Sequence, residues 1–487
     1  MANTIFQEIE PAAIWEHFAA LNAVPRASKK EERVIQFMLD FGARFGLQTI
    51  QDKVGNVIIR KPATAGMEDR KTVVLQSHLD MVHQKNNDTD FDFDRQGISM
   101  FIDGDWVKAK GTTLGADNGI GVAAIMAVLA SATIDHPAIE ALFTIDEETG
   151  MTGAKGLQGN LLTGDILLNL DTEEDTEIDI GCAGGIDITA RRTYIPETVS
   201  DDTTFHILTV KGLHGGHSGM EIHKGLGNAN KIMNRLLYSL LPLDIRLVSI
   251  DGGGLRNAIP RESVAVFAID GTSKDLLLSV VEQESAAIKQ ELAAVDEALE
   301  IELEAYGKIS DGVLPVAVQE KLIQTLYAAP NGVYGMSASF NNLVETSNNI
   351  ARVKVGNGKI TVKCLTRSSV ESAKVDLANA LKCCFELMDA EVTFSGDYPG
   401  WTPNPDSEIL DVLKNIYTQL FGEEPNVVAC HAGLECGILG SHYPEMDMIS
   451  FGPTILGAHS PQERVSISSV QKFWSFLTDI LKHIPVK

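Results

Sequence analysis

Residues 73–83 read Val-Val-Leu-Gln-Ser-His-Leu-Asp-Met-Val-His, and the strand that they predict organises the rest of the chain. The apolar start is typical of a buried strand, which ends in the His-x-Asp pair His78 and Asp80. Side chains alternate along an extended chain, so both polar side chains face the same way. An imidazole beside a carboxylate suits a metal site, although the pair taken alone is equally typical of surface residues.

Acidic residues follow the next predicted strands. The strand expected at 139–145 leads to Glu147 and Glu148, and the strand after it ends at Asp171. Asp117 stands in a glycine-rich turn before an apolar helix. Each of these motifs alone is also typical of a solvated turn or a helix N-cap.

The alternation of apolar strands with helices predicts an α/β fold, in which a mainly parallel sheet is covered by helices. Ligands of such sheets bind outside the carboxyl ends of the strands. The histidine and the carboxylates all fall at that level, which solvated turns do not explain. A polar stretch at 84–110 interrupts the pattern.

A second pattern begins near residue 185, where alternating strands and amphipathic helices indicate antiparallel α+β structure. We therefore expect one domain from residues 1–184 and 400–487, interrupted by an inserted domain at 185–399. The order of elements suggests that the insert has two similar lobes, near 187–310 and 311–398.

Composition limits the possible partners. At 487 residues the chain is too long for one compact core, and its net charge of −26 argues against nucleic acid and anionic membrane surfaces. The apolar runs are too short to cross a bilayer, and residues 1–11 lack the pattern of a secretion signal. Six cysteines without a C-x-x-C pair indicate reduced, structural thiols. We expect a cytoplasmic protein.

A late histidine, His459, stands in a loop that follows another predicted strand. Two histidines and several carboxylates without a thiolate suit zinc, cobalt or manganese. One histidine per ion and a bridging carboxylate accommodate two divalent ions. Their four positive charges and the three negative charges of Asp117, Glu148 and Asp171 leave a net charge of +1. A bound hydroxide would balance that charge and serve as the nucleophile, with Glu147 left as general base.

These motifs together resemble the five metal motifs of the cocatalytic-zinc peptidase and deacylase superfamily that includes carboxypeptidase G2 and aminoacylase-1. Within it, the sequence is most similar over its full length to the bacterial aminoacyl-histidine dipeptidases. The resemblance implies a zinc-exopeptidase-like catalytic domain, an inserted lid domain and two zinc ions per chain, for which cobalt or manganese could substitute. It implies that His78, Asp117 and Asp171 hold one ion and that Asp117, Glu148 and His459 hold the other. It further implies that Asp80 orients His78 and that Glu147 is the general base. Asn118 follows Asp117 where many relatives have a second Asp, which leaves Asp117 as the bridge.

The resemblance also assigns roles in the inserted domain. It implies that His217 stabilises the oxyanion and that Asn257 and Arg367 hold the free carboxylate of the substrate. It places Gly433 in a glycine-rich loop that lines the substrate pocket. The alternatives are a turn residue for His217 and a buried salt bridge for Arg367.

The implied activity is hydrolysis of dipeptides, with Xaa-His dipeptides such as carnosine preferred. An alternative with the same metal motifs is a deacylase of N-acyl amino acids or succinyl-diamino acids. A non-catalytic metal-dependent scaffold is a further alternative, although it predicts loss of the general base and Glu147 is present. A homodimer is left open, as is replacement of a partner subunit by the second lobe.

Overall fold

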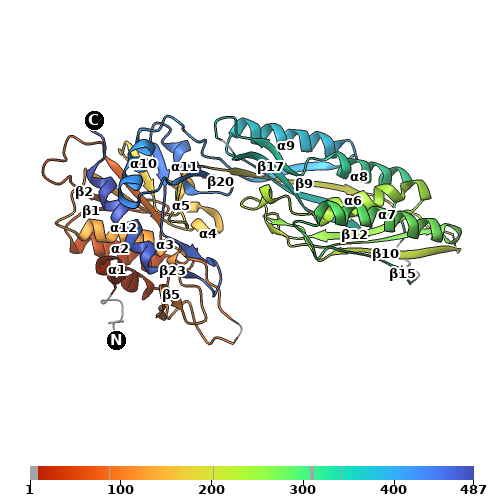
Figure 1. Ribbon diagram of the computed structural model, residues 1–487, viewed down its shortest axis with the longest axis horizontal. Helices are drawn as coiled ribbons and strands as arrows, with labels where there is room; N and C mark the ends of the chain where they lie inside the picture. Colours follow the sequence, from red (N-terminus) through yellow and green to blue (C-terminus); the bar gives the residue numbers. More distant parts are fainter. Residues whose placement is uncertain (1–8, 87, 201, 308–311, 341) are drawn as a thin grey trace. The chain divides into compact units, whose positions relative to one another are not determined.

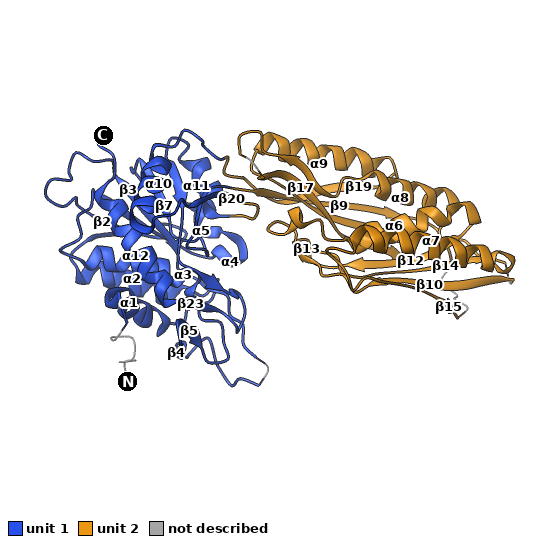
Figure 2. Ribbon diagram, in the orientation of Figure 1, with its two compact units in different colours: residues 1–181, 403–429, 434–487 blue, residues 182–402, 430–433 orange. Residues whose placement is uncertain are grey.

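The computed structural model describes residues 9–86, 88–200, 202–307, 312–340 and 342–487. Two compact units are distinguished by colour in Figure 2. Unit 1 contains residues 1–181, 403–429 and 434–487, and unit 2 contains residues 182–402 and 430–433. The assignment of these parts as catalytic domain and lid stays a prediction.

Unit 1 is built on an eight-stranded sheet, counted over the described residues, with the order β1-β2-β6-β3-β7-β21-β8-β20. Its strands are β1 (Gln48–Gln51), β2 (Val57–Lys61), β3 (Val73–His78), β6 (Ile139–Thr144), β7 (Ile166–Asn169), β8 (Glu177–Cys182), β20 (Asn426–Cys430) and β21 (Asp447–Ser450). The four central strands β6, β3, β7 and β21 pair in parallel, whereas β1, β2 and β8 pair antiparallel. Every residue of β3 and β6 is buried, as expected for strands covered on both faces.

Helices surround this sheet in Figure 1. They are α1 (Ala12–Asn22), α2 (Glu32–Arg44), α3 (Ala116–Ala130), α4 (Glu147–Gly150), α5 (Thr152–Gly156), α10 (Glu408–Phe421), α11 (Glu435–His442) and α12 (Ile467–Lys482). After Asp117 and Asn118, helix α3 is apolar on all sides and almost entirely buried, because it packs against both α1 and β3. Two of the long helices have N-cap serines, Ser407 on α10 and Ser466 on α12, whose side chains accept hydrogen bonds from backbone N–H groups of the first turn.

A small four-stranded sheet of unit 1 was not predicted from the sequence. It contains β4 (Met100–Asp103), β5 (Trp106–Ala109), β22 (Ile455–Leu456) and β23 (Arg464–Ser466). Its first two strands lie in the polar stretch 84–110. The other two pair with each other and enclose the loop that carries His459.

Unit 2 is built on a nine-stranded antiparallel sheet, again counted over the described residues. Its strands are β9 (Gly184–Thr193), β10 (Thr203–Lys211), β12 (Arg246–Gly253), β14 (Ser263–Asp270), β15 (Glu300–Tyr306), β16 (Gly332–Met336), β17 (Val344–Gly356), β18 (Lys359–Ser368) and β19 (Glu391–Tyr398). The long helices are α6 (Ala229–Leu240), α7 (Lys274–Leu292), α8 (Val316–Ala328) and α9 (Glu371–Glu386). Short elements complete the unit: β11 (Gly216–His217), β13 (Ala258–Ile259), and the 3₁₀ helices Ile222–Lys224, Leu241–Leu243 and Gly271–Ser273.

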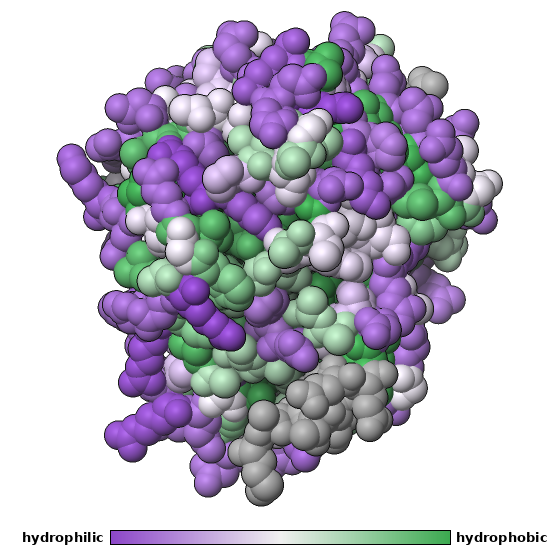
Figure 3. All heavy atoms as spheres, turned by 90° about the vertical axis from the view of Figure 1, so that its left-hand side faces the viewer, coloured by the Kyte–Doolittle hydropathy of each residue, from purple (hydrophilic) through white to green (hydrophobic). Residues whose placement is uncertain are grey.

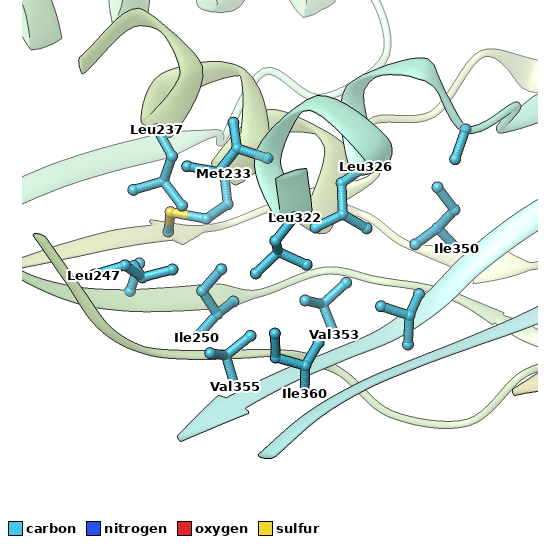
Figure 4. Packing of buried hydrophobic residues seen from close by; sticks show 14 of the residues in the cluster. Met233, Leu237, Leu247, Ile250, Leu322, Leu326, Ile350, Val353, Val355 and Ile360 are labelled. Atoms are coloured by element: carbon cyan, nitrogen blue, oxygen red, sulfur yellow. The ribbon is translucent and has the colours of Figure 1, made fainter. Parts of the chain in front are cut away.

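The core of unit 2 lies between these helices and the sheet (Figure 4). Leu237 of α6 and Leu322 of α8 point toward Leu247, Val353 and Ile360 of the strands. The two expected lobes share this one sheet, and β9 from the first segment lies between β18 and β19 from the second. The boundaries expected for the lobes, near 187–310 and 311–398, are therefore wrong, because β9 of the first segment pairs with two strands of the second. Such long-range pairing cannot be inferred from the order of the elements along the chain.

The described part of the chain contains no helix that is both long and apolar enough to cross a membrane. The face drawn in Figure 3 is mostly hydrophilic, with smaller apolar areas between the polar residues.

Candidate active site

The parallel strands of unit 1 bring the predicted ligands to one edge of the sheet. The register pairs His78 at the end of β3 with Thr144 at the end of β6. Glu147 and Glu148 begin the short helix α4 three residues after the end of β6, and Asp171 stands two residues after the end of β7. Apolar strand interiors therefore fix the sheet, and the polar residues after them meet at its carboxyl edge.

A first group contains His78, Asp117 and Asp171. His78 Nε2 lies 3.2 Å from Asp117 Oδ1 and 3.6 Å from Asp171 Oδ1. One potential ligand atom of each residue lies within 4.8 Å of the others, so the three could hold a metal ion.

A second group contains Asp117, Glu148 and His459, whose potential ligand atoms also lie within 4.8 Å of one another. His459 Nε2 lies 3.1 Å from Asp117 Oδ2 and 2.9 Å from Glu148 Oε2. Asp117 thus turns one carboxylate oxygen to each histidine, as a bridging ligand requires.

Asp80 lies behind His78 and is fully buried. Its Oδ1 is 3.4 Å from His78 Nδ1, and its carbonyl oxygen is 3.2 Å from the same nitrogen. The Asp80 carboxylate also accepts hydrogen bonds from the backbone N–H groups of Glu147 and Glu148, at 3.0 and 3.3 Å. One side chain therefore orients the ring of His78 and anchors α4, which carries two of the predicted residues.

The charges at this edge hold protons on both histidines. Burial lowers the pKa of His78, but the carboxylates of Asp171, Asp117 and Asp80 outweigh it and keep that pKa well above its usual value. Hydrogen bonds to Asp117 and Glu148 raise the pKa of His459 to about 11. A divalent cation would replace these protons as the counter-charge of the carboxylates.

The residues fit a pair of metal ions. Asp171 Oδ1 and Glu148 Oε1 are buried without a hydrogen-bond partner among the described residues. Buried carboxylate oxygens are costly to leave without a partner, and nitrogen and oxygen donors suit zinc, cobalt or manganese.

Glu147, like Glu148, offers a potential ligand atom within 4.8 Å of one on His78. Desolvation and the nearby carboxylates of Glu435 and Glu148 raise its pKa well above the usual value, although His78 opposes the shift. A raised pKa brings a carboxyl group closer to the range that suits a general base.

His217, Asn257, Arg367 and Gly433 all belong to unit 2. Strands β11 and β13 pair His217 with Ala258, and the N–H of Ser218 donates to the carbonyl oxygen of Asn257 at 2.7 Å. His217 and Asn257 are therefore held side by side.

The ring of His217 is held in one tautomer. Its Nδ1 accepts hydrogen bonds from the backbone N–H groups of Gly219 at 3.3 Å and Met220 at 3.1 Å. Burial and the positive charge of Arg367 lower its pKa to about 4. His217 is consequently neutral near pH 7 and carries its proton on Nε2.

Arg367 is 5% exposed and donates from Nη1 to the hydroxyl of Tyr398 at 2.8 Å. Among the described residues its Nε has no hydrogen-bond partner, and its charge acts on the carboxylate of Asp187, whose own ion pair is with Arg256. This arrangement disfavours the alternative of a buried salt bridge. Gly433 is half-buried and lies two residues after His431, whose Nε2 is 2.7 Å from the hydroxyl of Ser347.

Sequence reasoning missed the buried residues that support the ligands. Glu435 is fully buried and accepts hydrogen bonds from Gln76 at 2.7 Å and Thr144 at 2.5 Å. Arg26 and Glu463 hold the loop before Asp117. Their partners are mostly backbone groups distant in sequence, so no motif could have indicated them.

The sequence pattern of Peptidase family M20/M25/M40 matches residues 74–483. The chain belongs to this family. It is 46% identical over 481 residues to the cytosol non-specific dipeptidase of Escherichia coli (strain K12), with 99% of each chain covered.

Solved structures with the same fold include two peptidases. A crystal structure of aminoacylhistidine dipeptidase from Vibrio alginolyticus matches 99% of this chain and 98% of its own, with a TM-score of 0.93 and 45% identity. A tripeptidase from Staphylococcus aureus shares the fold at a TM-score of 0.57 and 16% identity, covering 98% of this chain and 99% of that one. The predicted α/β class and the family resemblance are confirmed.

We predict that zinc uptake releases protons at pH 7. His459 has a pKa of about 11, so it stays protonated well above neutral pH until a metal ion displaces the proton. Calorimetric titration of the metal-free protein in buffers of different ionisation enthalpy should show this release, and the His459→Ala variant should release fewer protons. An apparent enthalpy independent of the buffer would contradict the prediction.

Proposed function

We propose that this chain is a two-metal dipeptidase whose substrates include Xaa-His dipeptides such as carnosine. The observation that carries the proposal is the Asp117 carboxylate, whose two oxygens face His78 and His459. Full-length similarity to a non-specific dipeptidase and to an aminoacylhistidine dipeptidase supports the reaction and the substrate class.

Metal ions bound by the two groups would act as Lewis acids and bring the pKa of bound water to about 7. Glu147 would take the proton of the attacking water and deliver it to the leaving amine, a role that its raised pKa favours. Asp80 would keep the ring of His78 in place through its contact with Nδ1.

The residues of unit 2 would recognise and polarise the substrate. His217 has its Nε2–H available to donate to a developing oxyanion, because Nδ1 already accepts two backbone hydrogen bonds. Arg367 Nε has no hydrogen-bond partner among the described residues, which suits a guanidinium that binds the free carboxylate of a dipeptide. Asn257 is exposed next to His217 and would share this contact, and Gly433 would line the pocket.

Three further parts of the proposal concern metal identity, location and assembly. The nitrogen and oxygen donors support zinc at both sites, with cobalt or manganese as substitutes. The relative named as a cytosol dipeptidase supports a cytoplasmic location. A homodimer stays a prediction that light scattering tests.

The deciding experiment compares carnosine with N-acetyl-histidine and with a dipeptide that lacks histidine. The protein is stripped of metal and refilled with zinc. Zinc-dependent cleavage of carnosine but not of the acetylated compound would support the dipeptidase and its need for a free amine. Cleavage of N-acetyl-histidine alone would support the deacylase alternative, and cleavage of both dipeptides would show broad specificity.

Glu147 and Glu148 form a matched pair for mutation. Glu147→Gln should lower kcat by about 10²- to 10⁴-fold, because it removes the general base. It should retain both ions by elemental analysis. Glu148→Gln should lose zinc as well as activity, because it removes a ligand of the second group. Loss of zinc from Glu147→Gln would place Glu147 among the ligands.

The tautomer of His217 predicts how its variants behave. His217→Ala should lower kcat by about 10²- to 10³-fold, whereas His217→Gln should retain more activity because its amide can still donate. Neither variant should change zinc content.

Nitrogen-15 NMR of the imidazole should show a neutral ring with the proton on Nε2 at pH 5.5, since the pKa is lowered to about 4. Because the pKa of His217 is about 4 in the folded protein and about 6.5 in the unfolded chain, its contribution to the free energy of unfolding is fully present above pH 6.5. This contribution is lost as the pH falls toward 4. An imidazole of His217 that carries protons on both nitrogens at pH 5.5 would contradict this interpretation.

A further inference from the structure

The loop before Asp117 is bound by one buried carboxylate. Glu463, which is 3% exposed, accepts hydrogen bonds from four consecutive backbone N–H groups. Its Oε2 accepts from Leu114 at 2.7 Å and Gly115 at 2.9 Å, and its Oε1 accepts from Ala116 at 2.7 Å and Asp117 at 3.2 Å. These four N–H groups therefore point to one side of the loop, toward a single side chain.

The carbonyl side of the same loop is bound by Arg26, which is 1% exposed. Arg26 Nη2 donates to the carbonyl oxygen of Gly115 at 2.5 Å. Its Nη1 donates to the carbonyl oxygens of Leu79 and Asp80, both at 3.0 Å. One guanidinium thus ties the Asp117 loop to the strand end that carries His78.

The glycines of the loop reflect this arrangement. A Cβ at Gly115 would lie 2.5 Å from Arg26 Nη2, and a Cβ at Gly119 would lie 2.6 Å from the same atom. Gly115 also has a φ of 71°, which favours glycine. The guanidinium can approach the backbone here because neither position carries a side chain.

Glu463 also belongs to the loop that carries His459. Strands β22 and β23 pair on either side of this loop, and the N–H of Glu463 donates to the carbonyl oxygen of Ser460 at 3.0 Å. The loop consequently contacts Asp117 twice, once from His459 to its carboxylate and once from Glu463 to its backbone.

We propose that Glu463 is a positioning residue that, together with Arg26, fixes the Asp117 carboxylate so that one oxygen faces each metal group. The proposal rests on the two-metal function proposed above. Asp117 can face both histidines only while its backbone is held. Without Glu463, four N–H groups, three of them buried, would lose their shared acceptor and the loop would have to rearrange to find others.

The test is the Glu463→Gln variant, which keeps the shape of the side chain. The new amide NH₂ cannot accept the two N–H groups that one carboxylate oxygen accepts now. Glu140→Gln is the matched control, because Glu140 is also 3% exposed and accepts hydrogen bonds from the backbone N–H groups of Thr163 and Gly164. Glu140 lies near the start of β6, away from the end that leads to the ligands.

Zinc binding is measured on metal-free protein by competition with a chelator, and the cobalt-loaded protein is examined by absorption spectroscopy. We expect Glu463→Gln to bind zinc at least about tenfold more weakly, retain fewer than two ions and change the cobalt spectrum. Glu140→Gln should bind two zinc ions as the unaltered protein does, even if both variants melt at lower temperature. If Glu463→Gln fails to fold, Arg26→Lys is tested instead. This variant keeps the positive charge but loses the two guanidinium nitrogens that donate to separate carbonyl oxygens, and it should show the same weaker zinc binding.

Full zinc affinity in Glu463→Gln, or an equal loss in Glu140→Gln, would overturn the proposal. Failure of the proposed function looks different: unaltered protein that binds two zinc ions but cleaves no dipeptide overturns the substrate assignment and leaves this test valid.

Discussion

The shared carboxylate of Asp117 is the constraint on which the site depends. Two histidines from distant parts of unit 1 approach its two oxygens at 3.2 and 3.1 Å. Such a group can be buried only if positive charge balances it, because an uncompensated carboxylate in a protein interior is very costly. The raised pKa values of His78 and His459 favour positively charged rings in the absence of metal, and divalent ions would supply this charge when they bind. Several acidic residues can share this edge only if bound cations offset their mutual repulsion.

The sheet supplies the stiffness that this arrangement needs. One pleat below the ligands, Gln76 of β3 accepts a hydrogen bond from Asn169 of β7 at 2.5 Å, and Asn169 accepts one from Ser450 of β21 at 2.5 Å. Glu435 extends this row at the other side of Gln76. Gln76 and Asn169 each stand two residues before a predicted ligand, His78 and Asp171. We infer that this buried row of hydrogen bonds fixes how far the ends of β3, β7 and β21 extend relative to one another. A metal site needs this precision in the positions of its ligands.

Much of unit 1 could be predicted from the sequence because apolar runs mark its strands and polar residues stand directly after them. His78, Glu148 and Asp171 are therefore visible to pattern analysis. Arg26 and Glu463 are not, because a side chain that binds distant backbone groups leaves no periodic signal. The position of β9 between β18 and β19 was also hidden, since strand order in a sheet depends on long-range pairing. The antiparallel insert was predicted by its alternation, but its lobe boundaries were not.

The most direct test of the two-metal account is anomalous X-ray diffraction at the zinc edge from crystals of the zinc-loaded protein. The account predicts two zinc peaks roughly 3.5–4 Å apart. The Asp117 carboxylate should lie between them, with His78 at one peak and His459 at the other. A single peak, or two peaks of which only one is bound by Asp117, would contradict the account.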